Sequence, residues 1–582
     1  MLGSFRSLTI AAAGLLAAVS FGQAQTAPPT QAPILTGTAR FLPVLAKNGM
    51  VASQEKRATR VGVEILKAGG NAVDAAVAVG FALAVTHPQA GNIGGGGFML
   101  AHLAARNETI AIDYRETAPA AMTRDVFLDD RGEADPAKSR DSALGVGVPG
   151  TVAGLALAHE KYGSGKFTLA QLIAPAIKLA REGFAVDDDL ADTLPRAQLR
   201  LVRWPASAKI FLKPDGAALG RGQRLVQSDL AASLETIAAN GPRAFYEGPL
   251  AEKLVAGVRQ HGGIITLDNL KNYRAIERAP VRGNYRGYAI ASMPPPSSGG
   301  VHLIEMLNIL EGFSLRETGA ESAATLHLMI EAMKPAYADR AEFLGDPAFT
   351  KVPLAGLTSK RYAAELRQQI DTERARPSKE IRAGNPAPSE GDNTTHFSVV
   401  DSQGNAVANT YTLNFSYGLG LVAEGTGILL NNELDDFAAK PGAPNAYGLV
   451  GGDANAPGPG KRPLSSMSPT IVFRDGRVFL VAGTPGGSRI ITMVLQIILN
   501  TIDHQMNIAE AVAAPRIHHQ WLPDQVDAER GLSPDTMRLL EARGHKIAVG
   551  RTFGSANAIV VTPEGFFGAS DPRQRGTLAE GF

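Results

Sequence analysis

Cysteine is absent from the sequence. Its absence excludes a cysteine nucleophile, a thiolate-bound metal site and a disulfide framework. A chain without cysteine forms no disulfide bond in an oxidising compartment, so export from the cytoplasm places no redox demand on its folding.

The sequence also lacks an excess of charge of either sign. It has 57 Lys and Arg residues against 56 Asp and Glu residues, a formal net charge of +1. A nucleic-acid binder or a peripheral membrane protein would carry a basic surplus, so we expect neither nucleic acid nor a membrane surface as a partner. The hydrophobic fraction of 45% over 582 residues is that of a soluble globular protein with a large core.

Long apolar runs are scarce. The run near the N-terminus, Leu8–Phe21, has 14 residues, fewer than the roughly 20 that cross a bilayer. Arg6 precedes it, and the small residues Gly22 and Ala24 occupy the −3 and −1 positions of a cleavage site. The pattern predicts a signal peptide over residues 1–24, no stable membrane anchor, and a periplasmic or secreted protein.

The first two thirds of the chain have mostly helical patterns. Arg57–Val85 reads as two helices hinged at Gly69 and Gly70, the second apolar on all sides and therefore buried. The glycine-rich segment 91–100 leads into a strand, and because no Gly-Lys-Ser/Thr follows, we expect close backbone packing there and not a phosphate loop. Further helices are predicted at 151–162, 169–182, 225–240, 301–310, 323–344 and 359–372, and a strand at 110–115.

Residues 376–393 have a different character, with three prolines among charged residues and few apolar ones. They predict an exposed linker that can be cut without dismantling a core. Strands follow at 396–401 and 406–413, joined by a turn at 402–405 into a hairpin. Later strands are predicted at 427–430, 470–473, 478–482 and 558–562, and later helices at 490–502, 506–513 and 534–543.

Thr394 stands where the linker meets the first strand of this hairpin. A threonine hydroxyl is a poor nucleophile unless a base takes its proton. If the chain is cut between Asn393 and Thr394, the freed α-amine, with a pKa of about 7.7–8.0, can serve as that base within the same residue. A cuttable linker followed by a threonine at a strand start is the pattern that this chemistry needs.

The hairpin suggests a partner for this threonine. If Asp401 pairs with Ala406, Thr395 faces Thr412, and Thr412 then lies within one register step of Thr394. Its hydroxyl could orient the nucleophile, and Asn414 lies on the same face of the strand. Threonine also favours strands by propensity alone, so the same residues fit an ordinary structural strand.

Longer segments carry a more specific signal. The run DNTTHFSVVDSQGNAVANTYTLNFSYGLG, Asp392–Gly420, resembles the nucleophile hairpin of the γ-glutamyltransferases, or γ-glutamyltranspeptidases, which are N-terminal-nucleophile hydrolases. Other segments match the family in the same order: HPQAGNIGGGGFML, DYRETAP, MPPPSSGG, LLNNELDDF, KRPLSSMSP, TPGGSRI, APRIHHQW and GASDPR. The resemblance runs from about Asn48 to Phe582, and the combination of motifs is specific.

The resemblance implies a fold and an activity. The fold would be α+β, a four-layer αββα sandwich whose two stacked antiparallel sheets are shared by both fragments of a cut precursor. Thr394 would attack its own preceding carbonyl, giving a large subunit, 25–393, and a small catalytic subunit, 394–582, that stay together as a non-covalent heterodimer. It would then take the γ-glutamyl group of glutathione or a related compound as an ester. Water, an amino acid or a dipeptide would release that group, and no metal or organic cofactor is implied.

The resemblance also assigns roles to residues around the nucleophile. Thr412 would hydrogen-bond the nucleophile, and the backbone amides of Gly486 and Gly487 would form the oxyanion hole. Tyr447 would belong to a lid loop, Pro444–Asn455, that covers the pocket.

The glutamyl end of the substrate is a zwitterion, and a second set of residues is assigned to it. Arg115 would bind the α-carboxylate through its forked guanidinium, with Ser465 and Ser466 as added donors. The α-ammonium group would be surrounded by the acceptors of Asn414, Glu433 and Asp436. Taken singly, each of these residues is also typical of loops or of an exposed acidic turn.

Three alternatives remain open. An acylase of the same fold could cleave glutaryl or cephalosporin side chains, and a related hydrolase could cleave poly-γ-glutamate, although the lid favours small substrates. An exported solute-binding protein could capture glutamyl peptides, but it would need no scissile linker.

The adjacent His518 and His519 would point to opposite faces of a strand and suit no metal pair, and His396 is expected to be structural.

Overall fold

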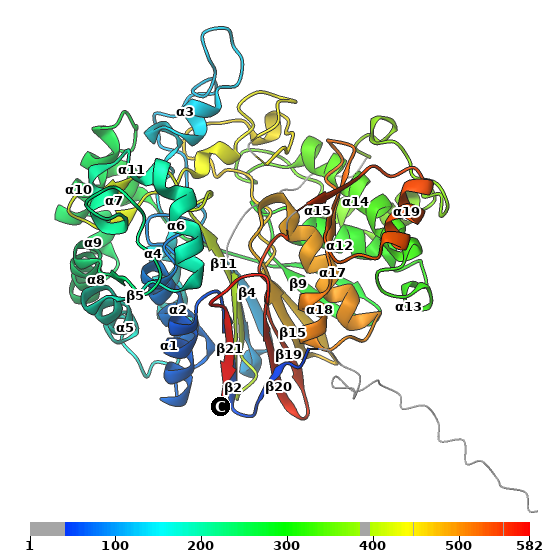
Figure 1. Ribbon diagram of the computed structural model, residues 1–582, viewed down its shortest axis with the longest axis horizontal. Coiled ribbons are helices and arrows are strands. Elements are labelled where there is room, and N and C mark those ends of the chain that lie inside the picture. The colour runs from blue at the N-terminus through cyan, green and yellow to red at the C-terminus, as the bar shows by residue number, and fades with distance from the viewer. Residues whose placement is uncertain (1–40, 385–395, 446, 551) are drawn as a thin grey trace, which may run out of the picture.

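The computed structural model describes residues 41–384, 396–445, 447–550 and 552–582. Its centre is a pair of stacked antiparallel sheets with seven strands each (Figure 1). The strands of the first sheet are, in spatial order, β1 (Val44–Ala46), β20 (Gly565–Ser570), β19 (Asn557–Thr562), β15 (Arg477–Gly483), β14 (Thr470–Arg474), β9 (Tyr288–Ser292) and β8 (Val281–Tyr285). Those of the second sheet are β21 (Leu578–Gly581), β2 (Gly49–Ser53), β10 (His396–Asp401), β11 (Ala406–Thr412), β3 (Gly96–Leu103), β4 (Glu108–Asp113) and β7 (Ile276–Arg278).

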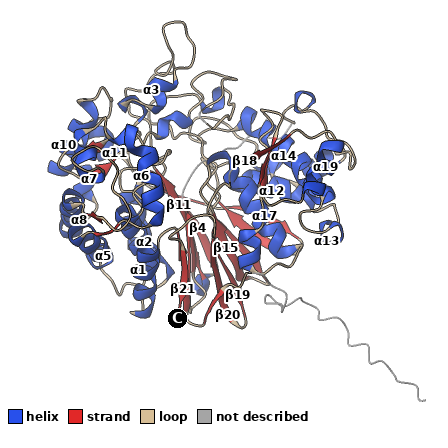
Figure 2. Cartoon of the chain, viewed as in Figure 1, coloured by secondary structure: helices blue, strands red, loops and turns tan. Residues whose placement is uncertain are grey.

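Helices cover the outer face of each sheet, so that the chain forms four layers (Figure 2). The second sheet shares a core with α1 (Lys56–Lys67), α2 (Ala72–Thr86), α4 (Thr151–Tyr162), α5 (Leu169–Glu182) and α8 (Ser228–Asn240). The first sheet shares one with α12 (Gly299–Leu310), α14 (Ala323–Phe343), α17 (Ile490–Ile502) and α18 (Ile508–Ala513). A separate core between the sheets includes Phe98, Ala408, Ile471 and Ile559. The predicted four-layer αββα architecture is confirmed.

Shorter elements complete the layers, and the sequence patterns missed many of them. The remaining helices are α3 (Pro136–Arg140), α6 (Asp188–Leu201), α7 (Pro205–Phe211), α9 (Arg243–Tyr246), α10 (Pro249–Arg259), α11 (Leu267–Asn272), α13 (Leu315–Thr318), α15 (Leu354–Leu357), α16 (Lys360–Arg367) and α19 (Pro534–Ala542). Small sheets are formed by β5 (Phe184–Ala185) with β6 (Arg224–Leu225), by β12 (Val422–Ala423) with β13 (Ile428–Leu429), and by β16 (Ile517–His518), β17 (Val526–Glu529) and β18 (Ile547–Gly550).

Helix α2 is buried on every side, as its all-round apolar sequence predicts. All 15 of its residues are buried. A capping box closes its first turn, because the Asn71 side chain accepts from the Asp74 amide and Asp74 accepts in return from the Asn71 amide. Asp74 is therefore a structural cap inside the core.

The hairpin of β10 and β11 has a register one residue away from the predicted one. Val400, and not Asp401, pairs with Ala406. Asp401 ends β10, and its amide donates to the Asn405 carbonyl at 3.1 Å, so the turn is shorter than predicted. The Asp401 side chain caps this turn, accepting from the Gln403 and Asn405 amides at 2.9 and 3.0 Å, and it also accepts from the Ala72 amide of α2 at 2.9 Å. Thr394 and Thr395 lie outside the described residues.

The expectation of an exposed linker over 376–393 holds only in part within its first residues, because Pro377, Lys379, Glu380, Arg382 and Gly384 are exposed but Ser378 and Ile381 are buried. Ser378 is buried and donates its amide and its hydroxyl to Asp524 at 3.0 and 2.7 Å. The Trp521 indole donates to the Ser378 carbonyl at 3.0 Å, and the Gly384 amide donates to Asp339 at 2.7 Å. These contacts fasten residues 376–384 to the body of the protein, and residues 385–393 lie outside the described part of the chain.

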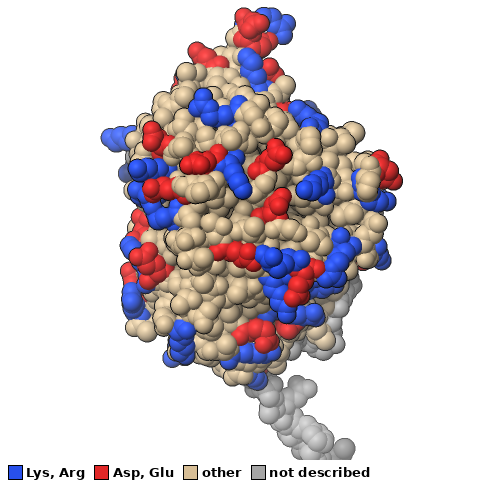
Figure 3. Space-filling model, turned by 90° about the vertical axis from the view of Figure 1, so that its left-hand side faces the viewer, with Lys and Arg blue, Asp and Glu red and all other residues tan. Residues whose placement is uncertain are grey.

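The surface matches the balanced composition. Figure 3 shows basic and acidic side chains intermixed over the face that it presents, as expected for a formal net charge of +1. Among the described residues, no helix combines the length and the hydropathy that a membrane span requires.

We expect Asp401→Ala to lower the free energy of unfolding by about 2–4 kcal/mol, because three backbone amides and the Asn405 side chain lose one charged acceptor. The midpoint of denaturant unfolding measures this change. Asp130→Ala, which removes an exposed aspartate, is the control and should leave the midpoint unchanged. Equal midpoints for the two variants would contradict the capping role of Asp401.

Candidate active site

Thr412 and Asn414 lie where the chain leaves the second sheet at the end of β11. The Thr412 hydroxyl accepts a hydrogen bond from the Asn414 amide at 2.8 Å, and Thr412 pairs across the sheet with Gly96. A Cβ atom on Gly95 would lie 2.0 Å from the Thr412 carbonyl oxygen. The glycine-rich segment therefore packs its backbone against the end of β11, which confirms the predicted close approach.

Gly486 and Gly487 follow β15 and lead into α17. Their φ angles of 144° and 59° lie in the region that favours glycine. A Cβ atom on Gly486 would meet Met493 at 2.5 Å, and one on Gly487 would meet the Tyr447 ring at 2.8 Å. Gly486 caps the short 3₁₀ helix η6 (Gly487–Arg489), and the leading amides of a helix have no acceptor within it. Two such amides can stabilise an oxyanion.

Arg115 follows β4 and is completely buried, with an exposure of 0%. Its Nη1 lies 2.5 Å from Glu433 Oε1, and its Nη2 lies 2.7 Å from Asp436 Oδ2. The guanidinium also donates to the carbonyls of Pro463 and Leu464, both at 3.2 Å. Glu433 and Asp436 come from the 3₁₀ helix η4 (Glu433–Asp436) and are buried, so they do not form the exposed acidic turn that was the alternative.

Burial shifts the pKa values of Arg115 and of the carboxyl groups around it. Burial lowers the pKa of Arg115, but Glu433 and Asp436 more than offset this effect and raise that pKa. Burial raises the pKa of Glu433 well above its ordinary value, although Arg115 opposes the shift. Glu116, 3.9 Å from Arg115 Nη1, has its pKa raised to about 7 by burial. Arg115 therefore stays charged among these carboxyl groups. The carboxyl oxygens around it could also accept hydrogen bonds from a bound ammonium group.

Buried polar atoms without partners adjoin this group. Ser465 is held against the loop at 296–298, because its amide donates to the Pro296 carbonyl at 3.2 Å and its carbonyl accepts from the Ser298 amide at 3.0 Å. Next to it, Ser466 Oγ has no hydrogen-bond partner within the described residues, and neither has Glu433 Oε2. Such atoms cost free energy unless a ligand or water satisfies them. They therefore indicate a polar ligand site.

Tyr447, from the predicted lid loop, contacts the residues at the end of β11. Its hydroxyl donates to Asn414 Oδ1 at 2.9 Å, and its ring stacks on Phe415 with centroids 5.3 Å apart. Tyr447 also lines a cavity of about 1120 Å³ together with Thr412, Asn414, Gly486 and Gly487. A second cavity of about 260 Å³ adjoins Asp436, Leu464 and the lid residues Asn445 and Leu449. The lid therefore borders both spaces.

The structure thus brings the predicted residues together in two adjoining groups. One contains Thr412, Asn414, Gly486, Gly487 and Tyr447, and the other contains Arg115, Glu433, Asp436, Ser465 and Ser466. The roles proposed for Asn393 and Thr394 fall outside the described residues.

Sequence reasoning gave no role to Glu116 or Phe415, which belong to the same region. Glu116 directly follows Arg115 in the sequence, but only the fold shows that it is buried with it. The Phe415 contact depends on the lid, so the sequence carries no signal for it.

His396, His518 and His519 each have hydrogen-bond partners within the fold. His396 is buried, its ring nitrogens lie 3.0 Å from Thr410 Oγ1 and 2.8 Å from Ser398 Oγ, and burial lowers its pKa to about 3. His518 contacts Thr492 at 2.9 Å, and His519 contacts Asp524 at 3.3 Å. The two adjacent histidines therefore have separate partners, as their opposite directions predict.

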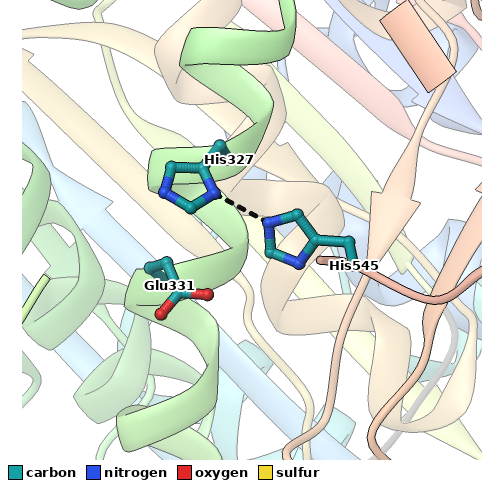
Figure 4. A group of neighbouring side chains, drawn as sticks. All are labelled: His327, Glu331 and His545. Atoms are coloured by element: carbon teal, nitrogen blue, oxygen red, sulfur yellow. Dashed lines mark hydrogen bonds between the residues drawn. The ribbon is translucent and has the colours of Figure 1, made fainter. Parts of the chain in front are cut away.

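A cluster that sequence reasoning missed lies outside this site (Figure 4). His327, Glu331 and His545 each offer a ligand atom within 4.8 Å of the others, an arrangement that could hold a metal ion. The same atoms also have protein partners: His327 contacts His545 and the Asp371 carbonyl, each at 2.7 Å, and Glu331 contacts Lys334 at 2.6 Å. Lys334 donates in turn to the Arg376 carbonyl at 2.7 Å. The cluster therefore fastens residues 371–376 without needing an ion.

Four layers around two antiparallel sheets, with the predicted nucleophile hairpin at the centre of one sheet, define an N-terminal-nucleophile hydrolase. A family profile described as Gamma-glutamyltranspeptidase matches residues 58–581. The chain therefore belongs to the gamma-glutamyltranspeptidase family, which makes it an enzyme of γ-glutamyl transfer and confirms the resemblance predicted from the sequence.

Known proteins agree with this assignment. The chain is 56% identical over 576 residues to the glutathione hydrolase proenzyme of Escherichia coli (strain K12), covering 98% of each chain. It is 41% identical over 545 residues to the Acylase ACY 1 proenzyme of Pseudomonas sp. (strain V22), covering 92% of this chain and 94% of that one. The crystal structure of cephalosporin acylase from Bacillus halodurans matches with a TM-score of 0.82 at 30% identity, covering 95% of this chain and 99% of that one.

We expect Gly486→Ala to lower kcat by about 100-fold or more, the size of effect that follows loss of an oxyanion-hole donor. Alanine is strained at a φ of 144°, so we expect the backbone and its amide to shift, and its Cβ would also meet the terminal methyl of Met493 at 2.5 Å and displace it. Gly476→Ala is the matched control, since Gly476 also has a positive φ of 76° but no atom within 4 Å of an added Cβ. Steady-state kinetics that gave both variants the same kcat would rule out the role of Gly486.

Proposed function

We propose that this protein is an exported glutathione hydrolase and γ-glutamyltransferase that is cut between Asn393 and Thr394. The signal peptide, residues 1–24, would be removed on export. The precursor would then become a large chain, 25–393, and a small catalytic chain, 394–582. Thr394 would be the nucleophile of both the cut and the catalytic reaction.

The observation that carries this proposal is the buried group around Arg115. A γ-glutamyl group ends in an α-carboxylate and an α-ammonium. The Arg115 guanidinium matches the first, while Glu433 Oε2, which lacks a partner in the described part of the chain, matches the second. An acyl group without these charges would leave buried polar atoms unsatisfied, which is costly.

The register of the hairpin supports Thr412 as the partner of the nucleophile. His396 pairs with Thr410, so a ladder continued by two residues assigns Thr412 to position 394. The Thr412 oxygen already accepts from the Asn414 amide at 2.8 Å. Its own hydroxyl proton is therefore available for donation to the Thr394 oxygen.

The reaction follows from these positions. The α-amine of Thr394 takes the hydroxyl proton, and the oxygen attacks the γ-carbonyl of the donor. The amides of Gly486 and Gly487 stabilise the oxyanion, and the proton passes to the leaving amine as the C–N bond breaks. The resulting ester is then released by water, which gives glutamate, or by the amine of an amino acid or dipeptide acceptor, which gives a new γ-glutamyl amide. These steps use no metal or organic cofactor.

Several contacts would keep the two chains together after the cut. Strands β10 and β11 pair with β2 and β3 of the larger part, and Ser378 and Trp521 join the segment before the cut to the smaller part. A non-covalent heterodimer is therefore the expected product, because the cut removes none of these contacts.

A glutaryl or cephalosporin acylase is the second candidate, because the cephalosporin acylase structure matches over 95% of this chain. A glutaryl side chain lacks the α-ammonium group. With such a donor Glu433 Oε2, which lacks a partner in the described part of the chain, would gain no ammonium group, so the geometry favours γ-glutamyl substrates.

We expect Thr394→Ala to leave the chain uncut and without γ-glutamyl anilide hydrolysis, because the variant lacks the hydroxyl on which both steps depend. A denaturing gel, N-terminal sequencing of the smaller fragment and release of 4-nitroaniline measure the outcome. Thr394→Ser is the control, since it keeps a hydroxyl and an α-amine and should still be cut. An intact, active Thr394→Ala chain would refute the proposal.

The choice between the two candidates can be tested with matched donors. We expect γ-glutamyl-4-nitroanilide to be cleaved about 100-fold more efficiently than glutaryl-4-nitroanilide, because the second leaves buried acceptors unpaired. Asp436→Asn should narrow this ratio of kcat/KM values by weakening the ammonium site. A preference for the glutaryl donor in the unmodified enzyme would favour the acylase.

A further inference from the structure

The cavity of about 1120 Å³ beside Gly486 and Gly487 carries a set of basic side chains that the proposed function does not use. Five arginines line it: Arg196, Arg489, Arg530, Arg573 and Arg575. Two acidic residues of α6, Asp189 and Asp192, also line it. The wall of this space is therefore predominantly basic, although the chain as a whole is nearly neutral.

Two of these arginines have structural roles. Arg573 pairs with Glu529 at 2.6 Å and with Asp571 at 3.1 Å, and Arg489 pairs with Asp527 at 2.5 Å. Both guanidinium groups are therefore committed to partners outside the cavity wall.

The remaining arginines differ in what lies near them. Arg196 follows Asp192 by four residues on α6, a spacing at which the two side chains are neighbours. Arg530, just after β17, and Arg575, between β20 and β21, are exposed and form no ion pair with any described residue. Asp189 accepts from the neutral Gln89 amide and so keeps its negative charge, and its Cβ lies 3.8 Å from the position of a Cβ added to Gly576, the residue after Arg575. Arg196, Arg530 and Arg575 are therefore the lining arginines that form no ion pair with a described residue, and of these Arg196 has an acidic lining residue one helical turn away.

The position of this cavity relative to the lid decides which part of a substrate it receives. Arg115, Glu433 and Asp436 do not line it, whereas Tyr447 and the two glycines do. A donor whose glutamyl end lies among Arg115 and its partners, with its γ-carbonyl at the glycines, must direct its leaving group into this cavity. The leaving group of glutathione is a dipeptide, whose carboxylate lies within about 7 Å of the broken bond, the reach of two extended residues.

We propose that Arg530 and Arg575 form a carboxylate subsite, which binds the C-terminal carboxylate of the departing dipeptide and of amino acid or dipeptide acceptors. This inference rests on the proposed function and specifies the substrates of the same site. A guanidinium binds a carboxylate through two parallel N–H donors, so an arginine pair distinguishes carboxylate-bearing groups from neutral ones. The subsite acts on binding, and the chemistry at Thr394 does not depend on it.

The test compares donors and acceptors with and without that carboxylate, using the processed two-chain enzyme. Arg530→Gln, Arg575→Gln and the double variant are assayed with glutathione and with γ-glutamyl-4-nitroanilide, whose leaving group has no carboxylate. We expect the double variant to raise KM for glutathione about tenfold and to leave KM and kcat for the anilide unchanged. With the anilide as donor, the KM for glycylglycine should rise similarly, and that for glycylglycinamide should not.

Arg361→Gln is the control, because Arg361 on α16 is exposed and lies outside the cavity lining. It should leave every constant unchanged. Equal effects of the double variant on glutathione and anilide, or no effect on either, would overturn the carboxylate subsite while anilide hydrolysis by the unmodified enzyme still supported the proposed function. Failure of the unmodified enzyme to cleave the anilide would count against the proposed function itself.

Discussion

The burial of the Arg115 guanidinium is the constraint on which the site depends. A charge with no exposure to water is tolerated only where paired charges and carbonyl acceptors replace its hydration. Glu433 and Asp436 supply the charges, and the loop at 463–464 supplies the carbonyls. Arg115 follows a strand of the first half of the chain, whereas its partners come from the second half. The network therefore joins both halves at the place where a glutamyl group would bind, and any displacement of η4 would leave a buried charge unpaired.

The sheets explain how such a site could survive a cut in the chain. β10 and β11 lie in the middle of the second sheet, between β2 on one side and β3 on the other. Their side chains enter the core beneath α2 on one face and the core between the sheets on the other. The hairpin is therefore held by neighbours on four sides. The contacts of Ser378 and Gly384 hold the segment 376–384 independently of the hairpin.

Sequence patterns predicted the elements whose signals are local. α4, α5 and α17 have the predicted ends, although α5 alone among these three has a side-chain capping box. The register of the β10–β11 hairpin was missed by one residue, since it depends on the contact of Asp401 with the distant Ala72 amide. The His327–His545 contact, over 218 residues, was beyond local reasoning for the same reason. Most of the proposed site residues came from resemblance to a family, and their mutual contacts came only from the fold.

The lid residue Tyr447 covers the site and lies between the regions that would bind the two ends of a substrate. Its ring lies against the Gly487 backbone, and its hydroxyl is bonded to Asn414, so closure of the lid contacts both the proposed oxyanion hole and the ammonium site. On the inner side of the lid, the carboxyl groups of Glu116, Glu433 and Asp436 surround the Arg115 guanidinium. On its outer side, the wall of the cavity beside Gly486 and Gly487 is predominantly basic. A peptide-like donor inserted with its C-terminal end inward would bring a carboxylate to Arg115 but no ammonium group to Glu433 and Asp436. The unmatched acceptors, together with the loss of a carboxylate from the basic outer wall, therefore oppose reversed binding before any bond is broken.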